Sequence, residues 1–393
     1  MDVKGIRHRY FLYTILYTFT QSLFFAFGAL LIYYKTDSVL WVLLFNIAAG
    51  VTSVLAKSIG FEVIVNSMRR WGLAPVMSFG LFLKIFSFLI IFFLTSANPN
   101  FYIVLLLMAV AGNLGSAIYN TGNTTLALEV IGISKFPGFS AALLNILEIL
   151  GSIGAIVAGI ILNYYGLFNF LFLAGAFMLL ISIFPLYGIP SPETPKIDFK
   201  SNFKTVPWSM ILANFNPDHE TQVTGIPLII LISSLSLHLS VEINALIAVF
   251  SIIFAYVTGK LIDKKNTNLI YITLIVAIIA WSSYIFIKTP LGFIVPGIII
   301  TLAMNILTLY REAHMGSFME KNKSYLNNTF IIEFSRSCGS LFATIVMISL
   351  YLIFNTLPKN ILAMSWIYLL PLAWYGLRQT KISTFAKILK AKI

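Results

Sequence analysis

Apolar stretches long enough to cross a lipid bilayer follow one another along almost the whole chain. Of its 393 residues, 59% are hydrophobic and only 10% are charged, and the mean hydropathy is +0.92. This apolar content is well above that of an ordinary soluble domain. A bilayer requires about 20 apolar residues per helix, and twelve stretches reach that length. The sequence therefore predicts an all-α, polytopic membrane protein with twelve transmembrane helices.

The predicted spans form two groups of six. The first group is 11–33, 39–59, 73–95, 101–123, 138–163 and 166–188, and the second is 207–233, 242–259, 269–287, 291–313, 326–354 and 361–377. The longest connection between them has 18 residues and contains three prolines. These short connections leave no extramembrane domain for a soluble activity.

The second half repeats features of the first, which predicts two pseudo-symmetric six-helix bundles. Leu147 and Glu148 in span five have counterparts in Ile332 and Glu333 in span eleven. Two bundles related in this way leave room between them for a cavity that opens alternately to either side. We expect an N-terminal bundle, a cytoplasmic linker, a C-terminal bundle and a basic cytoplasmic tail at 1–188, 189–206, 207–377 and 378–393.

The distribution of basic residues gives the orientation. With a cytoplasmic N-terminus, nineteen Lys and Arg residues lie inside and only Lys35, Lys288 and Lys359 lie outside. This asymmetry follows the positive-inside rule, so both termini are expected in the cytoplasm of a protein of the cell membrane. The net charge of +12 thus reflects topology and not nucleic-acid binding. The tail is expected to lie on the anionic inner leaflet, as an anchor or as a regulatory segment.

A glycine, an acid and successive cations occur together in the connection between spans eight and nine. This segment, 259–265, resembles the signature loop of the major facilitator superfamily, Gly-x-Leu-x-Asp-Arg/Lys. The corresponding segment of the first half, 65–72, keeps the basic pair and the final glycine but lacks the leading glycine and the aspartate. The resemblance implies two gating loops, with the residues Arg69, Arg70, Gly72, Gly259, Asp263 and Lys264.

The same resemblance implies a transporter fold in which spans one, four, five, seven, ten and eleven line a central cavity. Many proton-coupled exporters of the superfamily carry an arginine within span four. The matching region here has Asn113, Asn120 and Asn123 instead. We expect Asn120 to face the cavity together with Gln21 of span one, which the repeat sets opposite Asp218 of span seven.

Span seven contains the densest group of ionisable residues within a predicted span. Its apolar part is too short to cross comfortably, and extension upstream to Pro207 brings Asp218, His219 and Glu220 near mid-depth. Pro217 removes a backbone donor there, so the helix is expected to be kinked or unwound. Interrupted helices are common binding sites in transporters. In the alternative interpretation, the span starts later and these residues belong to a cytoplasmic loop.

Two carboxyl groups are expected at about one-third depth of spans five and eleven. A charge within a membrane span costs a few kcal/mol, so it is retained for function or neutralised by a partner. Glu333 has such a partner in Arg336 at i+3. Glu148 has none nearby in sequence, so we expect it to take up and release protons, or alternatively to bond to a neighbouring helix. Arg311 ends span ten and is assigned either to the cavity or to an interfacial charge cluster.

These patterns predict a secondary active transporter that moves a small polar solute by alternating access and is coupled to protons. No phosphate loop, nucleotide motif or redox motif is present, so we expect no cofactor, no resident metal and no enzymatic activity. Apart from solute, protons and membrane lipid, no partner is expected, and the protein is taken as a monomer. The alternatives are a divalent metal carrier that uses Asp218 and His219, or a sensor or enzyme built on the same fold.

Overall fold

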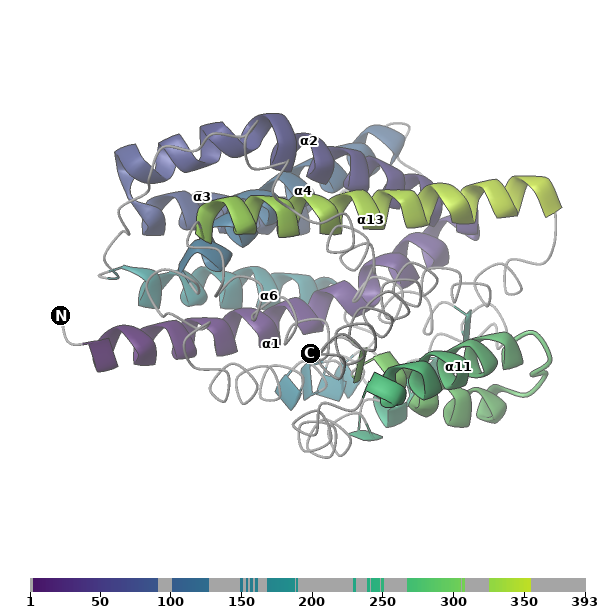
Figure 1. Cartoon of the computed structure of the whole chain (residues 1–393). Coiled ribbons are helices and arrows are strands. Elements are labelled where there is room, and N and C mark those ends of the chain that lie inside the picture. The colour runs from purple at the N-terminus through teal and green to yellow at the C-terminus, as the bar shows by residue number, and fades with distance from the viewer. Residues whose placement is uncertain are drawn as a thin grey trace, which may run out of the picture.

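In the part of the chain that it describes, the computed structural model consists of helices and short turns (Figure 1). It describes residues 3–90, 101–126, 149–150, 153–154, 156–157, 160–161, 168–187, 189, 229–230, 239–240, 242–247, 249–250, 267–304, 306–307 and 325–354. The principal helices are α1 (Val3–Thr36), α2 (Val39–Trp71), α3 (Leu73–Ile90), α4 (Phe101–Thr125), α6 (Phe168–Ile183), α11 (Thr267–Ser283) and α13 (Tyr325–Phe354). Two 3-10 turns, Phe184–Leu186 and Pro290–Phe293, and further helical residues, among them 294–304, are also described. These residues contain no strand, which agrees with the predicted all-α class.

Three helices of the described part are long and apolar enough to cross a membrane. They are Val39–Trp71, Phe101–Thr125 and Thr329–Ile353. Their neighbours have the same character. On α3, Phe79, Phe82 and Phe86 are exposed along one face, while Met77 and Leu81 are buried on the other. An exposed stripe of large apolar side chains suits contact with lipid. The fold is therefore that of a polytopic membrane protein, and the total of twelve spans stays a prediction.

Helix α2 extends beyond the predicted second span. The sequence predicts a span at 39–59 and a loop at 65–72, but the helix continues without interruption to Trp71. Arg69 and Arg70 therefore lie in the last helical turn, where cations interact favourably with the helix dipole. The helix ends at Gly72, whose φ of 94° is readily adopted only by glycine. Helix α3 begins at the next residue.

Helices α3 and α4 pack with their backbones almost in contact. A Cβ on Gly80 would lie 2.8 Å from the carbonyl oxygen of Gly115, and a Cβ on Gly115 would lie 2.5 Å from the carbonyl oxygen of Gly80. One side chain also bonds across the interface, because Ser87 Oγ donates to the carbonyl oxygen of Met108 at 2.9 Å. Small residues allow this close approach where both helices lie in lipid.

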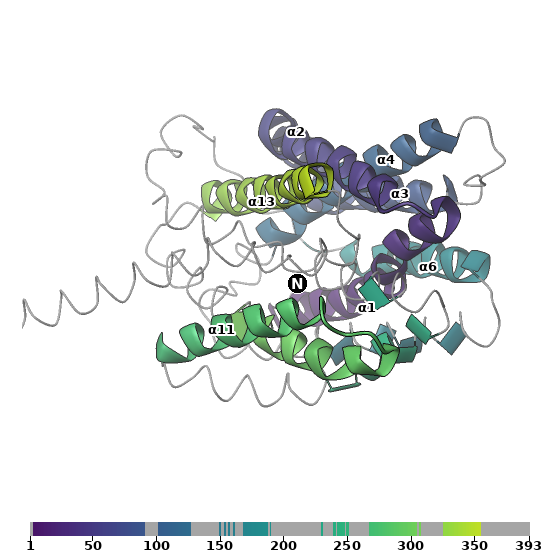
Figure 2. The same cartoon turned by 90° about the vertical axis from the view of Figure 1, so that its right-hand side faces the viewer.

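The two halves of the chain meet at α13. In both views α2, α3, α4 and α13 lie together at the top, above α1 and α6, with α11 lowest (Figures 1 and 2). Helix α13 comes from the second half of the sequence but contacts α2 and α4 of the first half. One apolar core also contains residues from both halves, among them Ile32, Val42, Leu105, Ile300 and Met347. The other core, around Tyr13, belongs to the first half.

Candidate functional site

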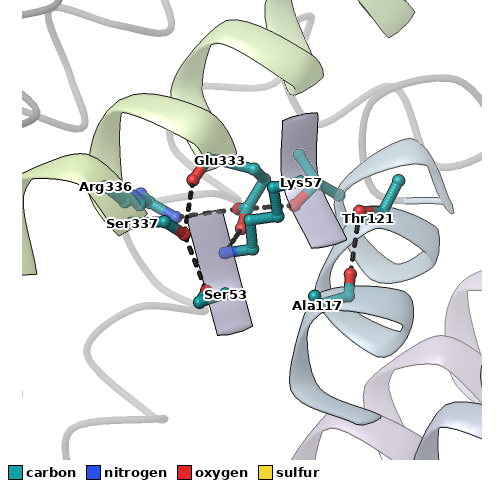
Figure 3. Close-up of polar contacts among 8 residues, drawn as sticks. Ser53, Lys57, Ala117, Thr121, Glu333, Arg336 and Ser337 are labelled. Carbon is teal, nitrogen blue, oxygen red and sulfur yellow. Dashed lines mark hydrogen bonds and ion pairs between the residues drawn. The ribbon is translucent and has the colours of Figure 1, made fainter. Parts of the chain in front are cut away.

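The candidate site lies where α13 crosses α2 and α4, and Figure 3 shows its polar residues. Four successive pairs of residues, about one helical turn apart, join α2 to α13: Gly50 with Leu341, Ser53 with Ser337, Lys57 with Glu333, and Phe61 with Phe330. The numbers rise along α2 while they fall along α13, so the two helices run in opposite directions. The two middle pairs are polar and the two outer pairs are apolar.

An ion pair between the two halves is the centre of this contact. Lys57 Nζ donates a hydrogen bond to Glu333 Oε2 at 2.7 Å, and the side chains are only 6% and 3% exposed. A hydrogen bond between two ionised groups is shorter and stronger than a neutral one. Both charges have been removed from water, so loss of one partner costs about 3–5 kcal/mol where the remaining charge has no second partner.

The carboxylate of Glu333 has further donors on its other oxygen. Thr124 Oγ1, from α4, donates to Glu333 Oε1 at 3.3 Å, and Arg336 Nη1 lies 3.3 Å from the same oxygen. Arg336 moves with Glu333 because the two are one turn apart on α13. Glu333 therefore receives one set of contacts from its own helix and another from the first half.

A hydroxyl pair continues the polar contact one turn along. The Oγ atoms of Ser53 and Ser337 are 2.8 Å apart, and Ser337 Oγ also donates to the carbonyl oxygen of Glu333 at 3.1 Å. Figure 3 shows these side chains between the ribbons of α2 and α13. The contact between the halves at this point thus depends on groups that water or a polar solute can also satisfy.

A second buried cation, Lys84, lies wholly within the first half. Its Nζ donates a hydrogen bond to the hydroxyl of Tyr17 at 2.5 Å and lies 4.9 Å from the centroid of that ring. These two distances place the ammonium beyond the hydroxyl oxygen and not over the ring face, so the contact is a hydrogen bond and not a cation–π interaction. Tyr17 stacks on Tyr119 with centroids 4.0 Å apart. The sequence analysis gave Lys84 no role, and this packing explains how α3 accommodates it.

The structure brings together some of the predicted site residues. Glu333 and Arg336 are in contact, as their i,i+3 spacing predicts. Asn120 is half-buried on α4, one turn before Thr124, and Gln21 lies in helix α1. The described part of the chain does not include the other predicted site residues, which are Glu148, Asp218, His219, Glu220, Gly259, Asp263, Lys264 and Arg311.

Sequence reasoning missed Lys57, Ser53 and Thr124. A signal for Lys57 was present, because it falls inside the predicted span 39–59 and a lysine within a span is costly without a partner. The identity of that partner was not accessible, since Lys57 and Glu333 are 276 residues apart. Among the described residues, no group of three or more His, Cys, Asp and Glu residues is arranged to hold a metal ion.

Comparison with known proteins shows the fold. No protein-family model matches the chain, and no curated protein matches it. Among solved structures, the chain is similar to the crystal structure of a bacterial homologue of the iron transporter ferroportin in an outward-facing state. The identity is 14%, the TM-score is 0.67, and the match covers 96% of this chain and 99% of that chain. The chain therefore shares the overall fold of that protein, in agreement with the all-α membrane fold that the sequence predicts.

Proposed function

We propose that the protein is a secondary active transporter, which moves a small polar solute across the membrane by alternating access. The observation that carries this proposal is the buried polar contact between the halves, Lys57 with Glu333 and Ser53 with Ser337. Polar groups held between two bodies can exchange their partners for water or solute when the bodies separate. The transporter fold supports the same conclusion.

The expected topology places this contact on one side of the membrane. With a cytoplasmic N-terminus, α2 runs inward and α13 runs outward. Residues 50–61 of α2 and 330–341 of α13 then lie from mid-membrane towards the cytoplasm. In this proposal the contact closes the cytoplasmic side and separates when the site opens inward. Proton coupling belongs to the proposal as well, with Glu148 as the expected proton carrier.

A divalent metal carrier is the second candidate. It is favoured by the likeness to a homologue of the iron transporter ferroportin. The residues expected to bind the metal are Asp218 and His219, whose oxygen and imidazole groups suit first-row metals. The two candidates share one mechanism and differ in what occupies the cavity. Thermal unfolding of the purified protein with metals, organic acids, amines and sugars identifies the solute for a flux assay.

A cross-link between the halves tests the proposed movement. The Oγ atoms of Ser53 and Ser337 are close enough for a disulfide in the double variant Ser53→Cys/Ser337→Cys, made with Cys338→Ala to remove the single native cysteine. In liposomes, oxidation should stop solute flux and reduction should restore it. Flux that continues after complete cross-linking would show that the helices do not separate here.

The matched control is a cross-link inside the first half. A Cβ on Gly112 would lie 2.7 Å from Ser87 Oγ, which fits a disulfide in the variant Ser87→Cys/Gly112→Cys between α3 and α4. Because these helices are expected to move as one body, this disulfide should leave flux unchanged. Loss of flux in both variants would point to a general effect of oxidation.

A further inference from the structure

We infer that Lys57 and Thr124 form a carboxylate-binding site of the first half, and that Glu333 occupies it as a tethered carboxylate. The transported solute then carries a carboxylate group, which replaces Glu333 when α2 and α13 separate. This inference rests on the proposed function and names the chemical class of its solute.

The geometry at Glu333 is that of a bound carboxylate. Lys57 Nζ reaches Oε2 at 2.7 Å and Thr124 Oγ1 reaches Oε1 at 3.3 Å, so each oxygen has its own donor from the first half. The two donors come from different helices, α2 and α4, which pack extensively on each other. Donors held in place in this way lose little entropy when a ligand binds.

Separation of the helices affects the two charges differently. Glu333 moves together with Arg336 on α13 and keeps that partner at 3.3 Å. Lys57 is 5% exposed, and its ion pair in the described part of the chain is with Glu333. Opening therefore separates the ammonium of Lys57 from its carboxylate and turns it towards the opened cavity, where an anionic group of the solute can take the position of Glu333.

The surroundings of Lys57 disfavour a cation in the same position. The position that Glu333 occupies lies directly against the ammonium of Lys57. A cationic solute would meet repulsion from this ammonium group. A carboxylate reproduces both contacts that Glu333 makes with the first half, and it is attracted by the charge of Lys57.

Removal of the tethered carboxylate tests the site with acetate as the probe and acetamide as its neutral control. In Glu333→Ala, the space left by the side chain should admit acetate, so acetate should raise the melting temperature in a concentration-dependent way. Acetamide, which has nearly the same shape, should not. The wild type should respond less than Glu333→Ala, since Glu333 competes for the same donors.

Two second-site variants assign the binding to the proposed residues. Lys57→Met combined with Glu333→Ala should abolish the response to acetate. Thr124→Val combined with Glu333→Ala should weaken acetate binding by about threefold to tenfold, the effect of one lost hydrogen bond. If Glu333→Ala does not fold, the rate of disulfide formation in Ser53→Cys/Ser337→Cys is measured instead, and it should fall with acetate and not with acetamide.

Equal responses to acetate and acetamide, or a response to acetate that persists without Lys57, would overturn the inference. These outcomes are separate from failure of the proposed function. If acetate does not bind but the cross-link between residues 53 and 337 still stops flux of another solute, the carboxylate site is wrong and the transporter stands. If acetate binds but the cross-link leaves flux of carboxylates unchanged, the site stands and the proposed movement is wrong.

Discussion

The contact between α3 and α4 and the contact between α2 and α13 join helices in different ways. In the first, Gly80 and Gly115 bring two backbones together with little side chain between them. In the second, ionic and hydroxyl groups such as Lys57 and Glu333 meet between helices of different halves. Lipid offers no replacement for the close packing of two backbones. Water, in contrast, can replace the partner of a polar group. The first contact is suited to holding a bundle together, and the second to being broken and remade.

The largest effect on stability is expected when one member of the ion pair between Lys57 and Glu333 is removed. Glu333→Leu leaves the ammonium of Lys57 buried without its carboxylate, and should lower the free energy of unfolding by about 3–5 kcal/mol. Lys57→Met should cost less, because Glu333 keeps Arg336 as a partner. Thermal unfolding of both variants at matched protein concentration measures the difference.

The double variant Lys57→Met/Glu333→Leu separates stability from transport. Apolar replacement of both members of a buried pair is often neutral, so this protein should unfold near the wild-type temperature. It should nevertheless fail to transport. A double variant that transports normally would mean that the ion pair has no part in the cycle.

A smaller loss of stability is expected when a side chain is added at the interface between α3 and α4. In Gly115→Ala the new Cβ would lie 2.5 Å from the carbonyl oxygen of Gly80 and 2.9 Å from the backbone nitrogen of Lys84, so the helices must move apart. Overpacking of this kind costs about 1–3 kcal/mol. The matched control is Gly60→Ala on α2, where the nearest atom to the new Cβ is 3.8 Å away. Similar melting temperatures for the two variants would contradict the close packing.

The smallest effect is expected at the hydroxyl that reaches Glu333 from α4. Thr124→Val removes one hydrogen bond of 3.3 Å and should cost about 1 kcal/mol. Thr121 lies one turn earlier, and its hydroxyl donates to the carbonyl oxygen of Ala117 within the same helix, at 2.8 Å (Figure 3). Thr121→Val is therefore the control, and only Thr124→Val should alter solute affinity. Equal effects of the two substitutions on solute affinity would mean that Thr124 contributes to the structure of α4 and not to solute binding.

The hydropathy pattern predicted the bounds of a helix correctly where the helix is apolar over its whole length. The predicted span 326–354 corresponds to α13, Tyr325–Phe354, because lipid-facing and buried residues are both apolar there. Helix α2 extends beyond the predicted span 39–59 because its last turns contain polar residues, including Arg69 and Arg70, which lower the hydropathy without breaking the helix. Helix termination at that point depends on the backbone of Gly72, which a hydropathy pattern does not record.

Only those contacts of the candidate site that join residues close in sequence could be predicted from the sequence. Glu333 and Arg336 are one turn apart, so helical geometry alone pairs them. The contact of Glu333 with Lys57 depends on how two distant helices cross, and a single sequence contains no information on that crossing. The predicted cluster Asp218, His219 and Glu220 lies outside the described residues and stays a prediction.

Helix α2 is uninterrupted, so a tilt about the contact at Lys57 is transmitted along its whole length. The helix has 33 residues, so at 1.5 Å per residue it is about 50 Å long, well beyond the apolar thickness of a bilayer. The part of α2 from Lys57 to Trp71 is about 20 Å long. A tilt of α2 by a few degrees about Lys57 is too small to disturb the packing there. It nevertheless displaces the end at Trp71 by roughly one ångström or more. That end joins α3 through Gly72 alone, so a tilt of α2 about the ion pair would also move the start of α3.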